Sequence, residues 1–184
     1  MSQAEGLHTE RLFIGAPTTA DARAAIARIL PKNLPGKLVA PDKWHFTLRF
    51  LGPTTREARD AIVARLSDAK LGSRFNVRFG ELGAFPNARR ARILWLGLAR
   101  GGVRLSELAA VAEDAARSAG FAPEGRGFKP HLTLSRIDPP QAISALLAQK
   151  HRYDIEMAVT ALILYRSQLG GGPARYEEVA RFDL

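Results

Sequence analysis

One short sequence occurs twice in this chain, and each copy contains the pattern His-x-Thr-Leu. Residues 43–48 read KWHFTL and residues 129–134 read KPHLTL. Polar and apolar residues alternate in both copies, which predicts β-strands over residues 44–51 and 131–135. The fold must therefore hold two matching strands, each with one polar and one apolar face.

Side chains two residues apart in a strand point to the same face. His45 and Thr47 are therefore expected to project together, as are His131 and Thr133. The leucine and phenylalanine residues between and after them point the other way, into a core. A helical pattern follows each copy. We expect two related lobes, each contributing one His-Thr strand to a shared groove.

The remaining sequence predicts further strands and helices. Strands are expected over residues 11–16, 75–85, 93–98, 153–159, 161–167 and 176–182. Helices are expected over residues 20–30, from a Thr54 cap to about Lys70, over 105–119, and over 141–149 after Pro139-Pro140. Gly52-Pro53 is expected to end the first motif strand, and Gly170-Gly171-Gly172 to form a turn. Adjacent strand pairs favour an α+β fold with mixed or antiparallel sheets over a doubly wound parallel fold.

The composition describes a basic globular protein. The chain has 184 residues, which fits one domain, and no cysteine, which excludes a disulfide scaffold and a thiolate nucleophile. Lysine and arginine number 27 against 18 acidic residues, giving a net charge of +9, and 21 of the 27 are arginine. Arginine matches phosphate geometry, so a phosphate-bearing partner is favoured, although such residues also simply solvate a surface.

The N-terminal segment has no features of a targeting signal. Residues 1–10 are polar, with neither a basic region nor an apolar region, and are expected to be flexible. No stretch approaches the roughly 18 apolar residues of a membrane helix, so the expected location is the cytoplasm.

Two histidines across a phosphate form an acid–base pair. The pKa of imidazole lies near ~6.5, so one ring can accept a proton while the other donates one. The neutral ring would activate water, and the protonated ring would protonate the leaving oxygen. Hydroxyls of Thr47 and Thr133 would donate hydrogen bonds to phosphate oxygens. This chemistry requires neither a metal nor a cofactor.

Other roles for the histidines remain open at this point. Histidine on a strand face is often structural, but two copies in matching context favour a functional pair. A metal site needs further ligands, and no Cys, Asp or Glu lies within three residues of either histidine on its face. His8 and His151 are expected to be solvated.

The sequence resembles the 2H phosphoesterase superfamily, and within it the RNA 2′,3′-cyclic phosphodiesterase (2′-5′ RNA ligase) family. The segments that carry the resemblance are RLFIGA (11–16), PDKWHFTLRFLG (41–52), GELGAFPNARRARILWLGL (80–98), GFKPHLTLSRI (127–137) and ILYRSQL (163–169), with a later Tyr176. The resemblance implies a bilobal fold in which two antiparallel sheets line a central cleft with helices outside. It also implies metal-independent hydrolysis of RNA 2′,3′-cyclic phosphate ends to 2′-phosphomonoesters, with reversible 2′-5′ ligation in several members.

The resemblance also assigns residues to roles. His45 would be the general acid for the leaving O3′ and His131 the base for water, with the order of these roles less certain. Thr47 and Thr133 would bind phosphate oxygens, and Arg136 would contact phosphate. Phe50 would stack on the terminal base. Independently of the resemblance, alternation along the strand is taken to place Phe50 on the same face as His45 and Thr47. Arg49 is expected on the opposite face, with no catalytic part.

The sequence also leads to expectations about the substrate and about alternative functions. The substrate would be RNA with a 2′,3′-cyclic phosphate end, such as a tRNA half, or a nucleotide, with no obligate protein partner. A non-catalytic RNA or nucleotide binder and an enzyme for small cyclic phosphates, such as ADP-ribose cyclic phosphate, are the alternatives. Arg89, Arg90 and Arg92 are a candidate RNA-tracking loop, whereas Trp44 and Trp95 are expected in the core.

Overall fold

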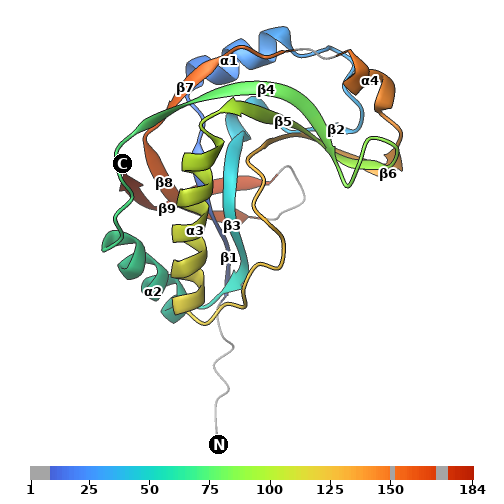
Figure 1. Cartoon of the computed structure of the whole chain (residues 1–184). Helices are drawn as coiled ribbons and strands as arrows, with labels where there is room; N and C mark the ends of the chain where they lie inside the picture. The colour runs from blue at the N-terminus through green and yellow to red at the C-terminus, as the bar shows by residue number, and fades with distance from the viewer. Residues whose placement is uncertain (1–8, 150–151, 169–173) are drawn as a thin grey trace, which may run out of the picture.

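The protein is an α+β structure built on one strongly curled antiparallel sheet, as the computed structural model shows (Figure 1). The structure describes residues 9–149, 152–168 and 174–184. The strands are β1 (Glu10–Pro17), β2 (Lys37–Leu38), β3 (His45–Thr54), β4 (Phe75–Phe85), β5 (Ala91–Arg100), β6 (Leu132–Gln141), β7 (Glu156–Val159), β8 (Ala161–Gln168) and β9 (Arg175–Asp183). The helices are α1 (Ala20–Ile29), the 3-10 turn η1 (Pro41–Lys43), α2 (Arg56–Ser67), α3 (Gly102–Ser118) and α4 (Ser144–Ala148). The α+β prediction is confirmed.

The sheet consists of two halves that meet at the two motif strands. Its strand order is β7-β4-β5-β6-β3-β1-β8-β9, with β2 paired to β6. Strands β3 and β6 share one antiparallel pair, Phe46 with Leu132, whereas β1 and β3 pair along most of their length. The two expected sheets are thus present as two halves, each ending on its motif strand, and a single residue pair joins them.

The register at this junction brings the two motifs together. Phe46 and Leu132 are both fully buried, so the opposite face of both strands carries the polar residues. Continuing the antiparallel register by one residue places His45 opposite Thr133, and Thr47 opposite His131. The four motif side chains therefore cluster on one side of the junction.

Helices α2 and α3 pack against each other, and α3 packs against β3. The predicted apolar face of α3 is buried, including Leu105, Leu108, Ala112 and Ala115. Figure 1 shows α1 and α4 at the opposite end of the molecule from α2. No helix in the part of the chain that the structure describes is long and apolar enough to cross a membrane.

Several boundaries differ from the sequence-based expectation near β3. The strand does not end at Gly52-Pro53 but continues to Thr54, because residues 52–54 still pair with β1, and Gly52 accommodates a left-handed φ of 74° within the strand. Thr54 is buried in β3 and donates a hydrogen bond to the Gly52 carbonyl. The cap of α2 is therefore Thr55, whose hydroxyl accepts a bond from the Ala58 N–H.

Two further expectations were wrong at the chain ends and after the second motif. The helix expected over residues 141–149 is shorter and spans Ser144–Ala148, because β6 runs through Pro139-Pro140 to Gln141. Glu10, which was expected to be flexible, instead belongs to β1 and forms ion pairs with Arg59 and Arg166. Residues 1–8, His8, His151 and the Gly170-Gly171-Gly172 turn lie outside the described residues.

Candidate active site

One cavity collects most of the residues that the sequence singles out. It has a volume of about 350 Å³ and is lined from both halves of the sheet. His45, Thr47 and Phe50 reach it from β3, and Thr133 and Arg136 reach it from β6. Five of the six predicted site residues therefore share one cavity. The sixth, His131, lies across the junction beside Thr47.

Backbone and hydroxyl groups fix the orientation of the His45 ring. Its Nδ1–H donates to the carbonyl of Lys43 at 2.8 Å, since a carbonyl only accepts. Its Nε2 then accepts from the Thr47 hydroxyl at 3.1 Å. The reactive nitrogen of His45 is therefore Nε2, on the same side as Thr47.

Aromatic rings surround His45 on the side away from the second motif. Phe13 stacks on the imidazole at 4.7 Å between ring centroids, and Tyr176 meets it edge-on at 5.2 Å. Tyr165 lies at 5.9 Å. These rings come from β1, β8 and β9, so the outer strands of this half shield one side of the histidine from water, while the other side borders the cavity.

This environment makes the protonated form of His45 unfavourable. Burial lowers the pKa of His45 from 6.5 to about 4, and the hydrogen bond to Lys43 opposes that change. The positive charges of Arg136 and His131 lower the pKa further. His45 is therefore neutral near pH 7, and His131 is close enough to affect its charge.

His131 is held by the same kind of backbone hydrogen bond as His45, but different aromatic residues surround it. Its Nδ1–H donates to the carbonyl of Lys129 at 2.7 Å, which matches the Lys43 bond in the first copy. Phe85 contacts the ring edge-on at 5.0 Å, and Trp95 lies at 6.1 Å. Burial lowers the pKa of His131, and the Lys129 charge adds to this effect against the carbonyl bond. Both histidines thus present Nε2 in the neutral state.

A β-bulge accounts for the position of Phe50. Strict alternation would place Phe50 on the face opposite His45, because the two positions differ by an odd number, so the alternation argument alone was wrong. The register between β1 and β3 shifts between the pairs Ile14–Arg49 and Gly15–Thr47. This shift buries Arg49 and leaves Phe50 45% exposed at the cavity, as expected for both residues.

The site also contains residues that the sequence did not single out. Phe13, Tyr165 and Lys43 were not singled out as site residues, and Tyr176 was noted only as a family landmark. Their contact with His45 depends on strand neighbours far apart in the chain, which one sequence does not reveal. The equivalent lysines two residues before each histidine were visible in the repeat and are the one local signal.

Basic residues near the cleft fall into two groups. Arg11, Lys43 and Arg136 line the cavity without an accompanying carboxylate. Arg89 lies in the turn between β4 and β5, and Arg92 lies at the start of β5, where it pairs with Asp138 at 3.8 Å. Among the described residues, no three histidine, aspartate or glutamate side chains gather in a manner suited to a metal ion.

Comparison with known proteins identifies the family. The sequence profile of the 2′-5′ RNA ligase superfamily matches residues 16–171. The chain belongs to this superfamily. Among relatives in the superfamily, the RNA 2′,3′-cyclic phosphodiesterase of Archaeoglobus fulgidus is 31% identical over 179 residues, covering 94% of this chain and 99% of that protein. The Escherichia coli enzyme of the same name is 29% identical over 178 residues, covering 95% and 97%.

A third relative and two solved structures extend the comparison. The RNA 2′,3′-cyclic phosphodiesterase of Aeropyrum pernix is 35% identical over 115 residues, which is 62% of this chain and 65% of that protein. A phosphoesterase crystal structure matches with a TM-score of 0.78 and 27% identity over 96% of this chain and 99% of that one. Escherichia coli LigT complexed with 3′-AMP matches with a TM-score of 0.76 and 27% identity, at 96% and 99% coverage. The 2′-5′ RNA ligase superfamily thus accounts for the fold of nearly the whole chain.

Proposed function

We propose that this protein hydrolyses RNA 2′,3′-cyclic phosphate ends to 2′-phosphomonoesters, with His45 and His131 as the acid–base pair. The observation that carries the proposal is the symmetric presentation of the two rings. Each Nδ1–H donates to the carbonyl two residues earlier, so each Nε2 is left for proton transfer. The names of the relatives in the superfamily support the same reaction.

The proposed reaction is an in-line displacement at phosphorus. His131 Nε2 takes a proton from water as the water oxygen attacks the phosphorus atom. The bond from phosphorus to O3′ breaks, and O3′ takes a proton from His45 Nε2. The phosphate remains on O2′, which gives a 2′-phosphomonoester. No proton or electron is required from outside the site and its solvent.

Thr47, Thr133 and Arg136 would stabilise the charge that develops on the non-bridging oxygens. The two threonine hydroxyls lie across the junction from each other, and Arg136 brings a fixed positive charge to the same cavity. Hydrogen bonds aimed at developing charge are among the largest contributions to catalysis. The threonine–histidine bond of the unliganded site would then be exchanged for a bond to phosphate.

His45 must take up its proton from solvent when the substrate binds. The low pKa of His45 keeps the ring neutral in the free protein, whereas an anionic phosphodiester beside it would favour the imidazolium.

The acid and base roles are separable with an aryl phosphodiester, because p-nitrophenolate leaves without protonation. On this substrate we expect His45→Ala to keep most of its activity and His131→Ala to lose it. The reverse result would exchange the two roles.

We propose RNA as the physiological substrate, with the terminal base on Phe50. The exposed ring of Phe50 lines the cavity with the motif residues, and stacking on an aromatic ring is worth about 1–3 kcal/mol per base. Arg89 and Arg90 would contact the RNA backbone, and a tRNA half is one such substrate. Small cyclic phosphates, such as 2′,3′-cyclic nucleotides, form the second candidate class because the cavity accepts one nucleotide.

The deciding experiment uses an RNA oligonucleotide with a 2′,3′-cyclic phosphate end in excess EDTA. We expect the wild-type protein to produce a 2′-phosphate end, and His45→Ala and His131→Ala to lose at least 10²-fold in kcat/KM. Arg28→Ala, an exposed change on α1, serves as the matched control. Turnover that disappears with EDTA would point to metal chemistry, and tight RNA binding without turnover would point to a non-catalytic binder.

A further inference from the structure

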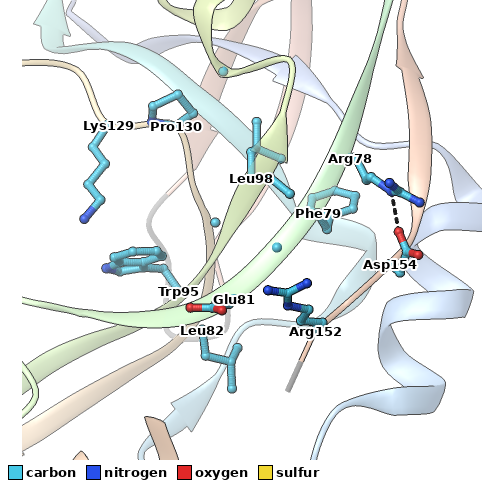
Figure 2. Close-up of a pocket in the computed structure, with 14 residues that line it drawn as sticks. Arg78, Phe79, Glu81, Leu82, Trp95, Leu98, Lys129, Pro130, Arg152 and Asp154 are labelled. Carbon is cyan, nitrogen blue, oxygen red and sulfur yellow. Dashed lines mark ion pairs between the residues drawn. The ribbon is translucent and has the colours of Figure 1, made fainter. Parts of the chain in front are cut away.

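The two lysines of the repeat line different cavities. Lys43 lines the cavity of about 350 Å³ that holds most of the motif side chains, where the phosphate of the proposed function would bind. Lys129 lines a second cavity of about 690 Å³, which strands β4 and β5 largely form (Figure 2). The two lysines are equivalent in sequence, but only one of them faces the phosphate.

The ammonium group of Lys129 lies over two aromatic rings. It is 4.4 Å from the centroid of the Trp95 ring and 5.7 Å from that of Phe85, and Figure 2 shows the Lys129 side chain pointing toward Trp95. A Cβ added at Gly83 would meet the indole at 2.2 Å, and one at Gly97 would meet it at 2.9 Å. The absence of a side chain at both positions lets the indole lie against the strands, which fixes the surface under the ammonium group.

The same two rings contact His131. Phe85 of β4 meets the imidazole edge-on at 5.0 Å, and Trp95 of β5 lies at 6.1 Å, so the cation and the histidine share one pair of rings. The Lys129 charge adds to burial in lowering the pKa of His131. From β3, the titratable group near His131 is His45, which is neutral near pH 7. Lys129 therefore supplies the permanent positive charge beside His131.

The charge of Lys129 is not neutralised within the larger cavity. Glu81 of β4 and Arg152 line that cavity, and Arg78 forms an ion pair with Asp154 there. No carboxylate in the described part of the chain forms an ion pair with Lys129. The one remaining carboxylate of the cavity, that of Glu81, thus faces two cations, and positive charge remains near the shared rings.

Binding of an anionic phosphate would affect the two histidines differently. A phosphate in the smaller cavity raises the pKa of any imidazole beside it. Arg136 and Lys43 line that cavity, so the phosphate would offset their charges. Lys129 lines the other cavity, so its charge would persist after the phosphate binds. His45 would therefore take up a proton more readily than His131.

Resting on the proposed function, we propose that Lys129 is a positioning residue whose ammonium group, fixed over Trp95 and Phe85, keeps His131 unprotonated while phosphate is bound. The proton from solvent then goes to His45, which carries it to O3′. His131 stays able to accept the proton of the attacking water. Lys129 acts through His131 and not on the substrate.

The first test is a titration of both imidazoles by nuclear magnetic resonance, with and without adenosine 2′-monophosphate. In the wild type, the nucleotide should raise the pKa of His45 by about 1 unit more than that of His131. Lys129→Met keeps the apolar stem and the main-chain carbonyl, and it should raise the pKa of His131 by about 0.5 unit and reduce this difference. Lys129→Arg keeps the cation and should titrate as the wild type does.

The second test is the pH dependence of kcat/KM for RNA with a 2′,3′-cyclic phosphate end. Because the alkaline limb follows His131, Lys129→Met should move it up by about 0.5 pH unit and lower the maximum about threefold. Lys129→Arg should restore both values. Arg152→Met is the matched control, because it removes a cation that lines the same cavity but lies apart from the Trp95 ring (Figure 2), and it should leave the profile unchanged.

The outcomes separate this inference from the proposed function. The inference is overturned if Lys129→Met leaves the His131 titration and the alkaline limb in place, or if Lys129→Arg or Arg152→Met changes them equally. Any of these results in a protein that still hydrolyses the RNA end leaves the proposed function intact. The expected titrations in a protein that hydrolyses no cyclic phosphate would instead overturn the proposed function.

Discussion

At the scale of single residues, the environment of His45 sets the protonation state of the site. Aromatic rings bury the imidazole, and Arg136 and His131 add positive charge nearby. Each effect favours the neutral ring, and the carbonyl of Lys43 opposes them without prevailing. His45 therefore stays neutral near pH 7 until an anion binds beside it.

The pH dependence of kcat/KM should reflect these shifts. This parameter reports the pKa values of the free enzyme. Because the pKa of His45 is about 4 and that of His131 is also lowered, the bell-shaped profile should lie on the acid side of 6.5. Removing the Arg136 charge raises the pKa of His45, so Arg136→Gln should move the acid limb to higher pH. Lys37 pairs with Arg136 across β2 and β6, and Lys37→Gln should leave the acid limb in place. An alkaline limb above pH 7.5 in the wild type would contradict the lowered pKa values of the two histidines.

At the scale of elements, the buried side chain of Arg49 connects several segments around the cleft. Arg49 of β3 is 9% exposed and forms an ion pair with Glu113 of α3 at 2.6 Å. It also donates to the carbonyls of Phe50 at 2.7 Å and Ala122 at 2.6 Å. Arg49 thus ties the first motif strand to α3 and to the segment that leads to the second motif.

Loss of this cation should destabilise the fold. We expect Arg49→Met to lower the free energy of unfolding by about 2 kcal/mol, because hydrogen bonds to charged groups are lost and the buried Glu113 oxygen that pairs with Arg49 loses its cation. The comparison variant is Arg65→Met, whose pair with Asp114 is solvent-exposed and should be worth less than about 1 kcal/mol. Urea denaturation measures both, and equal losses would exclude a special role for Arg49.

Among the strands and helices, some features could be predicted from the sequence and others could not. Both motif strands and the buried face of α3 were predictable because period-two and helical patterns are local. The bulge that turns Phe50 toward the cavity was not, since it arises from pairing with β1. The shift of the α2 cap to Thr55 reflects the pairing of residues 52–54 with β1, which extends β3 by three residues beyond the expected Leu51.

At the scale of the whole molecule, the two halves depend on a narrow junction. Phe46 and Leu132 form the pair between the motif strands, and the Phe46 ring stacks on Phe79 at 6.0 Å between centroids. The aromatic rings around His45 and those around His131 belong to different halves. Their relative position, and so the site, was beyond prediction from the sequence because it depends on long-range packing.

Truncation at the junction should affect stability and catalysis together. Phe46→Ala removes a fully buried ring, and such changes cost about 3–5 kcal/mol. We therefore expect a large drop in melting temperature and, in the folded fraction, a loss of hydrolysis that exceeds any change in RNA binding. Ile29→Ala, at a residue 48% exposed on α1, is the control and should leave both nearly unchanged. A stable Phe46→Ala protein with full hydrolysis would show that the junction does not set the site.

The hydrogen-bond acceptors for the two Nδ1–H groups are main-chain carbonyls of residues 43 and 129. Every amino acid carries that group, so no single substitution at either position deletes the acceptor. The side chains of residues 43 and 129 can therefore be substituted without changing the tautomer of the following histidine, that is, which of its nitrogens carries the proton.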